Sequence, residues 1–190
     1  MKSKVQSLLA VALIGAVLIC PVMATSSFPD VDENANYAEA VEYLNDIGIM
    51  RGDNRGNFNP DNPVTRAEMA TIICNMLNEA EDLAVSDNFT DVPTTHWANK
   101  YVTKAAELGI VSGYGNGKFG PDDTVNYEQA VKMIVSAAGH SDYSNEQGGY
   151  PDGYLKVAAE LGYTTGLSPQ KGELLKRWQV AVITSNALFY

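Results

Sequence analysis

The chain has 190 residues, of which 45% are hydrophobic and 19% charged, and its formal net charge is −10 at pH 7. An electrostatic field of that sign works against binding to nucleic acid and to anionic membrane surfaces, so we expect neither as a partner. The length is sufficient for one compact unit with a real hydrophobic core.

The N-terminal segment 1–24 has the features of a secretory signal peptide. Lys2 and Lys4 precede an apolar run from Leu8 to Ile19, and Val22-Met23-Ala24 forms a cleavage site. The apolar run is short for a membrane-spanning helix, and no stop-transfer sequence follows it. We therefore expect a secreted, strongly acidic protein that begins near Thr25 and is not an integral membrane protein after cleavage.

Cys74 is the one cysteine that remains after this cleavage, so the exported protein is expected to have no internal disulfide. It falls on the apolar side of a predicted helix, near Ile73 and Met76. This position favours a buried thiol over a reactive one.

Two copies of one pattern follow the signal at a constant offset. Phe28 corresponds to Phe89, Gly48 to Gly109, and Pro60 to Pro121, without an insertion. A fixed period of 61 residues indicates a repeat architecture. We divide the chain into a signal peptide (1–24), repeat 1 (25–82), repeat 2 (83–142) and a degenerate repeat 3 (143–190).

Each repeat is predicted to consist of a helix, a loop and a second helix. Hydrophobic spacing predicts helices at 37–47, 66–78, 97–108, 127–138, 154–161 and 176–188. The segment 140–149 is expected to be a polar loop. The loop of repeat 3, at 166–174, is shorter than the loops of the other two repeats and has no counterpart of Phe58 or Phe119.

One such unit cannot bury enough apolar surface to offset its chain entropy. We therefore predict a mainly α fold in which three helix-loop-helix repeats pack as a pseudo-three-fold bundle. The loops and the starts of the second helices are expected to lie in grooves between neighbouring repeats.

The stretch from Thr65 to Glu68 opens the second helix of repeat 1. Thr65 and Glu68 have the spacing of a capping box, and Asn126 and Gln129 repeat it. The loop glycines of both repeats are predicted to occupy turn positions with positive φ, and they are Gly52, Gly56, Gly113 and Gly117.

Arg66 is not explained by capping. A cation in the first turn of a helix lies at the unfavourable end of the helix dipole. We therefore expect its guanidinium to project into the adjacent groove, where its planar fork suits a carboxylate. Two interpretations stay open: Glu68 or another acidic side chain holds the guanidinium, or it binds an anionic ligand.

Together these elements resemble the S-layer homology motif. They are Phe28-x-Asp30-Val31, Gly48-Ile49, the loop with Gly52, Gly56, Phe58 and Pro60, and Thr65-Arg66-Ala67-Glu68. The resemblance covers nearly the whole mature chain and implies a three-pronged pseudo-trimer that anchors exported proteins non-covalently to the bacterial cell wall. The implied ligand is an anionic secondary wall polysaccharide, often ending in a pyruvylated amino sugar whose carboxylate meets the motif arginine.

The resemblance also implies a set of ligand-binding residues. Arg66 is the main contact, supported by Asp30, Gly52, Asp53 and the loop amides, and Glu68 is also counted among the ligand-binding residues. In repeat 2, Tyr127 replaces the arginine, so we expect that groove to lack a guanidinium, with Lys118 as a partial substitute and Tyr127 or Trp97 stacking on a sugar. In repeat 3, Arg177 restores a cation beside a shortened loop, and Gln179 takes the place of Glu68.

Other function classes are less well supported by the sequence. His96 and His140 belong to no metal-spaced cluster, no nucleophile elbow is present, and Cys74 lacks a placed base, so we expect no catalytic residue, metal or cofactor. The alternative is an exported interaction module that binds an S-layer or envelope protein or self-assembles. Either way, the predicted location is the cell wall and cell surface (S-layer), with a cell-wall polysaccharide or peptidoglycan-linked polymer as the main partner.

Overall fold

The structure is a computed structural model that describes residues 26–79 and 83–189, so the expected signal peptide lies outside the described residues. The described residues form seven helices and no strand, which confirms the mainly α fold class. None of these helices is long and apolar enough to cross a membrane. The helices are α1 (Ala38–Asp46), α2 (Arg66–Met76), α3 (Asn99–Glu107), α4 (Tyr127–Ala137), α5 (Ser141–Glu146), α6 (Asp152–Glu160) and α7 (Arg177–Leu188).

Six of these helices were predicted, and each begins and ends within two residues of the predicted bounds. The exception is α5, which occupies the segment 140–149 that was expected to be a loop. This helix has six residues and packs against α6, with Ser144 buried and Tyr143 exposed. The prediction was wrong there because such a short polar helix carries no apolar stripe that periodicity could reveal.

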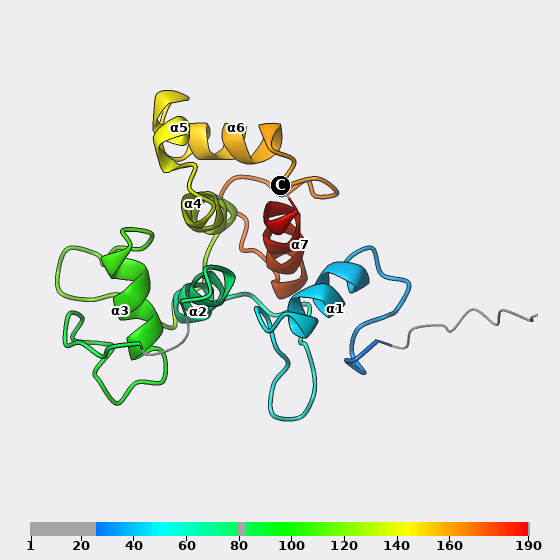
Figure 1. The fold of residues 1–190 in the computed structure, drawn as a ribbon, viewed down its shortest axis with the longest axis horizontal. Coiled ribbons are helices and arrows are strands. Elements are labelled where there is room, and N and C mark those ends of the chain that lie inside the picture. Colours follow the sequence, from blue (N-terminus) through cyan, green and yellow to red (C-terminus); the bar gives the residue numbers. More distant parts are fainter. Residues whose placement is uncertain (1–25, 80–82, 190) are drawn as a thin grey trace, which may run out of the picture.

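The first helix of each repeat packs on the second helix of another repeat. Figure 1 shows α2, α4 and α7 in the middle of the molecule, with α1, α3 and α6 around them. The outer helix α3 packs on α2, α6 packs on α4, and α1 packs on α7. The first helix of each repeat is therefore covered by a second helix from another repeat.

A ring of backbone hydrogen bonds joins the segments that lead into the inner helices. The Val64 amide donates to the Leu175 carbonyl (3.3 Å), the Leu175 amide to the Val125 carbonyl (3.3 Å), and the Val125 amide to the Val64 carbonyl (2.9 Å). All three side chains are fully buried, so these pairings also satisfy polar groups that water cannot reach. The ring supports the pseudo-three-fold packing, which stays a prediction.

The helix caps match their predictions. The Glu68 amide donates to Thr65 Oγ1 (3.2 Å) and the Thr65 amide to Glu68 Oε2 (2.8 Å). Asn126 and Gln129 make the same two bonds, each 3.0 Å long. At the start of α7 the Lys176 amide donates to Gln179 Oε1 (2.8 Å), whereas the lysine side chain has no acceptor atom and makes no cap bond in return.

Two of the four loop glycines differ from their prediction. Gly56 and Gly117 have positive φ, but Gly52 and Gly113 do not. Their requirement is space, because a Cβ atom at Gly52 would lie 2.6 Å from the Phe28 ring, and one at Gly113 would lie 2.6 Å from the Lys118 carbonyl oxygen. These two glycines thus allow the loops to pass close to the phenylalanine rings that open their repeats, Phe28 and Phe89.

Cys74 is buried, as predicted, and its thiol lies 3.4 Å from the Tyr101 carbonyl oxygen. Burial raises the pKa of this thiol to about 11. Among the residues that the structure describes, no group of three or more histidine, cysteine or acidic side chains could hold a metal ion.

Candidate functional site: grooves between repeats

Each long loop is held by one aspartate at the opening of its repeat. Asp30 accepts hydrogen bonds from the amides of Phe58 (2.8 Å) and Asn59 (2.7 Å), one on each carboxylate oxygen. Asp91 accepts in the same way from Phe119 and Gly120, at 2.8 Å each. Asp30 therefore fixes the loop that forms the groove wall, and a direct contact between Asp30 and a ligand stays a prediction.

Arg66 lies against the loop of repeat 2. Its Nε donates to the Phe119 carbonyl (2.9 Å) and its Nη2 to the Ser112 carbonyl (2.8 Å). The guanidinium carbon is 4.4 Å from the centroid of the Phe119 ring and 5.0 Å from that of Tyr114. The side chain is only 9% exposed, and no carboxylate of the described residues lies within ion-pair distance of it.

The expected grouping of Arg66 with Gly52 and Asp53 is therefore wrong. The inner helix of repeat 1 opens toward the loop of the next repeat: the Arg66 amide donates to the Asp123 carbonyl (2.8 Å) and the Ala67 amide to the Pro121 carbonyl (3.0 Å). The repeat frame gives the residues of each groove but not which copies meet, because every copy carries the same apolar pattern.

Arg177 lies against the loop of repeat 1 and makes the equivalent contacts. Its Nε donates to the Phe58 carbonyl (2.9 Å), its Nη2 donates to the Arg51 carbonyl (2.8 Å), and its guanidinium carbon is 4.8 Å from the Phe58 ring centroid. Burial lowers the pKa of Arg177, and the nearby charges of Glu68 and Asp53 act in the opposite direction. Arg177, rather than Arg66, shares a groove with Gly52, Asp53 and Glu68.

We call this first cavity the Arg177 groove. It has a volume of about 830 Å³ and lies between the loop of repeat 1, α2 and α3. Trp97 on its rim is 57% exposed. The lining combines two guanidiniums, aromatic rings, side-chain amides and two carboxylates, and includes Arg177, Arg51, Trp97, Tyr101, Asn59, Asn62, Asn75, Asp53 and Glu68.

The Arg66 groove is the corresponding cavity one repeat further along. It has a volume of about 240 Å³ and is lined by Arg66, Ile110, Val111, Ser112, Gln129, Lys132, Met133 and Tyr150. Tyr150 is 51% exposed, and the Lys132 ammonium lies 6.0 Å from the centroid of its ring.

Sequence reasoning missed Lys132 and Tyr150. The repeat offset could have found both, since Lys132 stands in repeat 2 where Thr71, which lines the Arg177 groove, stands in repeat 1. Tyr150 precedes Gly162 by the same interval by which Trp97 precedes Gly109. Trp97, predicted for repeat 2, in fact lines the groove that is formed with the loop of repeat 1.

The cavity beside the loop of repeat 3 has no lysine or arginine in its lining. It has a volume of about 390 Å³ and lies between α1, α7 and residues 165–166. Tyr127, which stands where the other grooves have arginine, is half-buried, and burial raises the pKa of its hydroxyl, which makes a side-chain hydrogen bond with Thr164. Lys118 is exposed and lines none of these three cavities.

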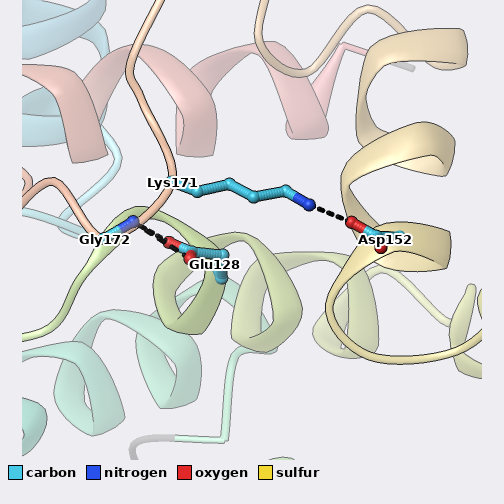
Figure 2. A network of polar contacts seen from close by, with 4 residues as sticks. All are labelled: Glu128, Asp152, Lys171 and Gly172. Carbon is cyan, nitrogen blue, oxygen red and sulfur yellow. Dashed lines mark hydrogen bonds and ion pairs between the residues drawn. The ribbon is translucent and has the colours of Figure 1, made fainter.

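Figure 2 shows how the short loop of repeat 3 is fastened. The Glu128 carboxylate accepts from the Gly172 amide at 2.8 and 3.0 Å, and the Lys171 ammonium pairs with Asp152 at the start of α6.

The expectation that the groove of repeat 2 lacks a guanidinium is wrong, because Arg66 lies against the loop of that repeat. Both guanidiniums meet full-length loops, and the tyrosine starts the helix beside the short loop.

Comparison with known proteins identifies two of the three repeats. The family model of the S-layer homology domain matches residues 27–70 and 88–131. Each match contains a loop-holding aspartate and the start of an inner helix. The matches do not extend into residues 143–190, so the degenerate third repeat stays a prediction that the contacts of Arg177 support.

The chain is also similar to several cell-surface proteins. It is 36% identical over 181 residues to a "Cell surface protein" of Thermoanaerobacter kivui, covering 93% of this chain and 23% of the relative. It is 32% identical to the "Middle cell wall protein" of Brevibacillus brevis (88% of this chain, 16% of the relative) and 26% identical to "S-layer protein sap" of Bacillus anthracis (72% and 16%). The chain thus spans less than a quarter of the length of these relatives, and their names confirm the predicted location at the cell wall and cell surface.

Proposed function

We propose that the chain is a member of the S-layer homology domain family and a cell-wall anchoring module that binds an anionic wall polysaccharide through the grooves between its repeats. The observation that carries the proposal is the placement of Arg66 and Arg177. Each guanidinium donates hydrogen bonds from Nε and Nη2 to backbone carbonyls and has no carboxylate partner among the described residues. A guanidinium has five N–H donors in total. Each arginine also lines a groove, and we propose that its remaining donors bind the ligand there.

The other lining residues suit a saccharide. Trp97 and Tyr150 are exposed aromatic rings at corresponding positions of the two grooves, and each can lie against the apolar face of a sugar while its polar atom stays accessible. A carboxylate such as that of a pyruvylated sugar would match the planar fork of the guanidinium. Asp53 and Gly52 are proposed as parts of the wall of the Arg177 groove.

The role is proposed to be structural rather than enzymatic, in keeping with the names of the relatives. Peptidoglycan that is incubated with the chain should release no soluble fragments. Release of reducing ends above the level of a heat-treated sample would contradict this part of the proposal.

Co-sedimentation with isolated bacterial walls tests the binding. Arg66→Ala and Arg177→Ala should each lower the fraction that pellets several-fold, because one charge-assisted contact contributes about 1.5–3 kcal/mol. Arg55→Ala is the matched control, since Arg55 is an exposed loop arginine that lines neither groove. Thermal unfolding followed by circular dichroism shows whether each variant keeps the fold.

Unchanged pelleting of both folded groove variants would contradict the saccharide site. Wall binding that protease treatment of the walls abolishes would instead favour the alternative, an interaction module for an envelope protein. Self-association of the chain in the absence of walls would favour the self-assembling form of that alternative.

A further inference from the structure

We infer that the two arginine grooves have different ligand classes: the Arg66 groove selects the anionic end of the glycan, and Lys132 and Gln129 determine that selectivity. The Arg177 groove takes a stretch of glycan for which charge is not required. This inference rests on the proposed function, since it assumes that the grooves bind wall saccharide.

The two grooves are lined at corresponding positions, which makes their differences informative. Ile49 and Ile110 correspond, as do Met50 and Val111. Two polar differences fall on the inner helices, where Glu68 in the Arg177 groove becomes Gln129 in the Arg66 groove, and Thr71 becomes Lys132. A third falls in the loops, where Arg51 of the Arg177 groove corresponds to Ser112 of the Arg66 groove.

The capping residue presents a different group to each groove. In Glu68 one carboxylate oxygen, Oε2, accepts from the Thr65 amide and hydroxyl, which leaves a charged acceptor, Oε1. In Gln129 the oxygen accepts from the Asn126 amide, which leaves Nε2, a neutral donor. The same cap therefore repels an anion in one groove and can donate to an anion in the other.

The charged residues of the two linings also favour an anion in the Arg66 groove over the Arg177 groove. The Arg177 groove has two guanidiniums, of Arg177 and Arg51, and two carboxylates, of Asp53 and Glu68. The Arg66 groove has the guanidinium of Arg66 and the ammonium of Lys132, and none of its lining residues is acidic. In a chain with a net charge of −10, this groove is a local concentration of positive charge that attracts an anionic group.

The volumes and aromatic residues of the two grooves also support different ligand classes. At about 240 Å³ the Arg66 groove has less than a third of the volume of the Arg177 groove, at about 830 Å³. The small groove fits an end residue, with Tyr150 beside Lys132 as a stacking surface. The large groove, with Trp97 and Tyr101, accommodates a longer neutral stretch.

Two reciprocal double variants test the inference. Gln129→Glu/Lys132→Thr gives the Arg66 groove the residues of the Arg177 groove, and Glu68→Gln/Thr71→Lys makes the opposite change. Both variants keep a Glu or Gln in the capping box, so the fold is expected to persist. The probes are isolated bacterial walls and the same walls after chemical reduction of their carboxylates, titrated at low and high salt.

The first variant should bind native walls about tenfold more weakly and lose most of the salt dependence of wild-type binding, because a cation is replaced and an anion added. The second variant should bind native walls at least as tightly as the wild type. Equal effects of both variants, or no effect of the first, would overturn the inference even if wild-type binding to walls upholds the proposed function. Absence of wild-type binding to native walls would overturn the proposed function itself.

The reduced walls identify the anion. If wild-type binding falls to the level of the first variant on reduced walls, the ligand group is a carboxylate. If the difference between wild type and first variant persists on reduced walls, the group is a phosphate of the wall polymer. Both results support the cationic Arg66 groove.

Discussion

At the scale of single residues, the aspartates that open the repeats stabilise the grooves without lining them. Both carboxylate oxygens of Asp91 accept backbone amides of the loop that holds Arg66. Burial alone would raise the pKa of Asp91, but the amides of Phe119 and Gly120 outweigh it, and the pKa lies below its ordinary value. The ionised form is therefore the one that stabilises the fold.

Asp91→Asn should lower the free energy of unfolding by about 1.5–3 kcal/mol at pH 7, the range for hydrogen bonds to a charged group. The asparagine amide nitrogen cannot accept the bond that one carboxylate oxygen now accepts. Denaturant unfolding measures the difference. Asp87→Asn is the control, because Asp87 is exposed and makes no hydrogen bond with the residues that the structure describes.

The pH dependence gives a second check on Asp91. Because the folded-state pKa is lowered, its stabilisation is present above the unfolded pKa of about 3.9 and is lost as the pH falls through the folded value. The stability gap between wild type and Asp91→Asn should therefore close below about pH 4. A gap that is constant from pH 7 to pH 3 would show that the carboxylate charge is not the cause.

At the scale of elements, hydrophobic periodicity predicts six helices, and the spacing of polar residues at two helix starts predicts both capping boxes, because these features are local in sequence. The pairing of elements was not predictable, since α2, α4 and α7 carry equivalent apolar stripes and any outer helix could in principle cover any of them. For this reason Arg66 was assigned to the loop of its own repeat, whereas it contacts Ser112 and Phe119. Distinguishing the copies requires contacts between residues far apart in sequence.

The exchange of partners between repeats predicts that no repeat pair is stable without the third. Removal of residues 143–189 exposes the faces of α1 and α4 that α7 and α6 cover, and it removes Leu175 from the backbone ring. A chain of residues 25–142 should therefore show no cooperative thermal transition. A sharp melt of this fragment, or a dispersed amide spectrum, would contradict the interdependence of the repeats.

At the scale of the whole molecule, the packing between repeats places two dissimilar grooves in one unit. The Arg66 side chain extends from repeat 1 to the loop of repeat 2, and the Arg177 side chain extends from repeat 3 to the loop of repeat 1. Each groove is therefore lined by residues of all three repeats. Under the proposed function, a wall polymer that occupies one groove would be held at high local concentration near the other.

This arrangement predicts avidity on walls that short glycans do not reveal. Linked sites raise overall affinity by about 10²–10⁴ over either site alone, so losing one groove on an intact wall also loses the linkage. Arg177→Ala should therefore weaken wall binding roughly tenfold more than it weakens binding to soluble wall oligosaccharides that are too short to span both grooves. Titration of both probes with wild type, Arg177→Ala and the Arg66→Ala/Arg177→Ala double variant measures this. Equal losses on the two probes would mean that the grooves act one at a time, and the stiff placement of two sites would then contribute nothing to retention.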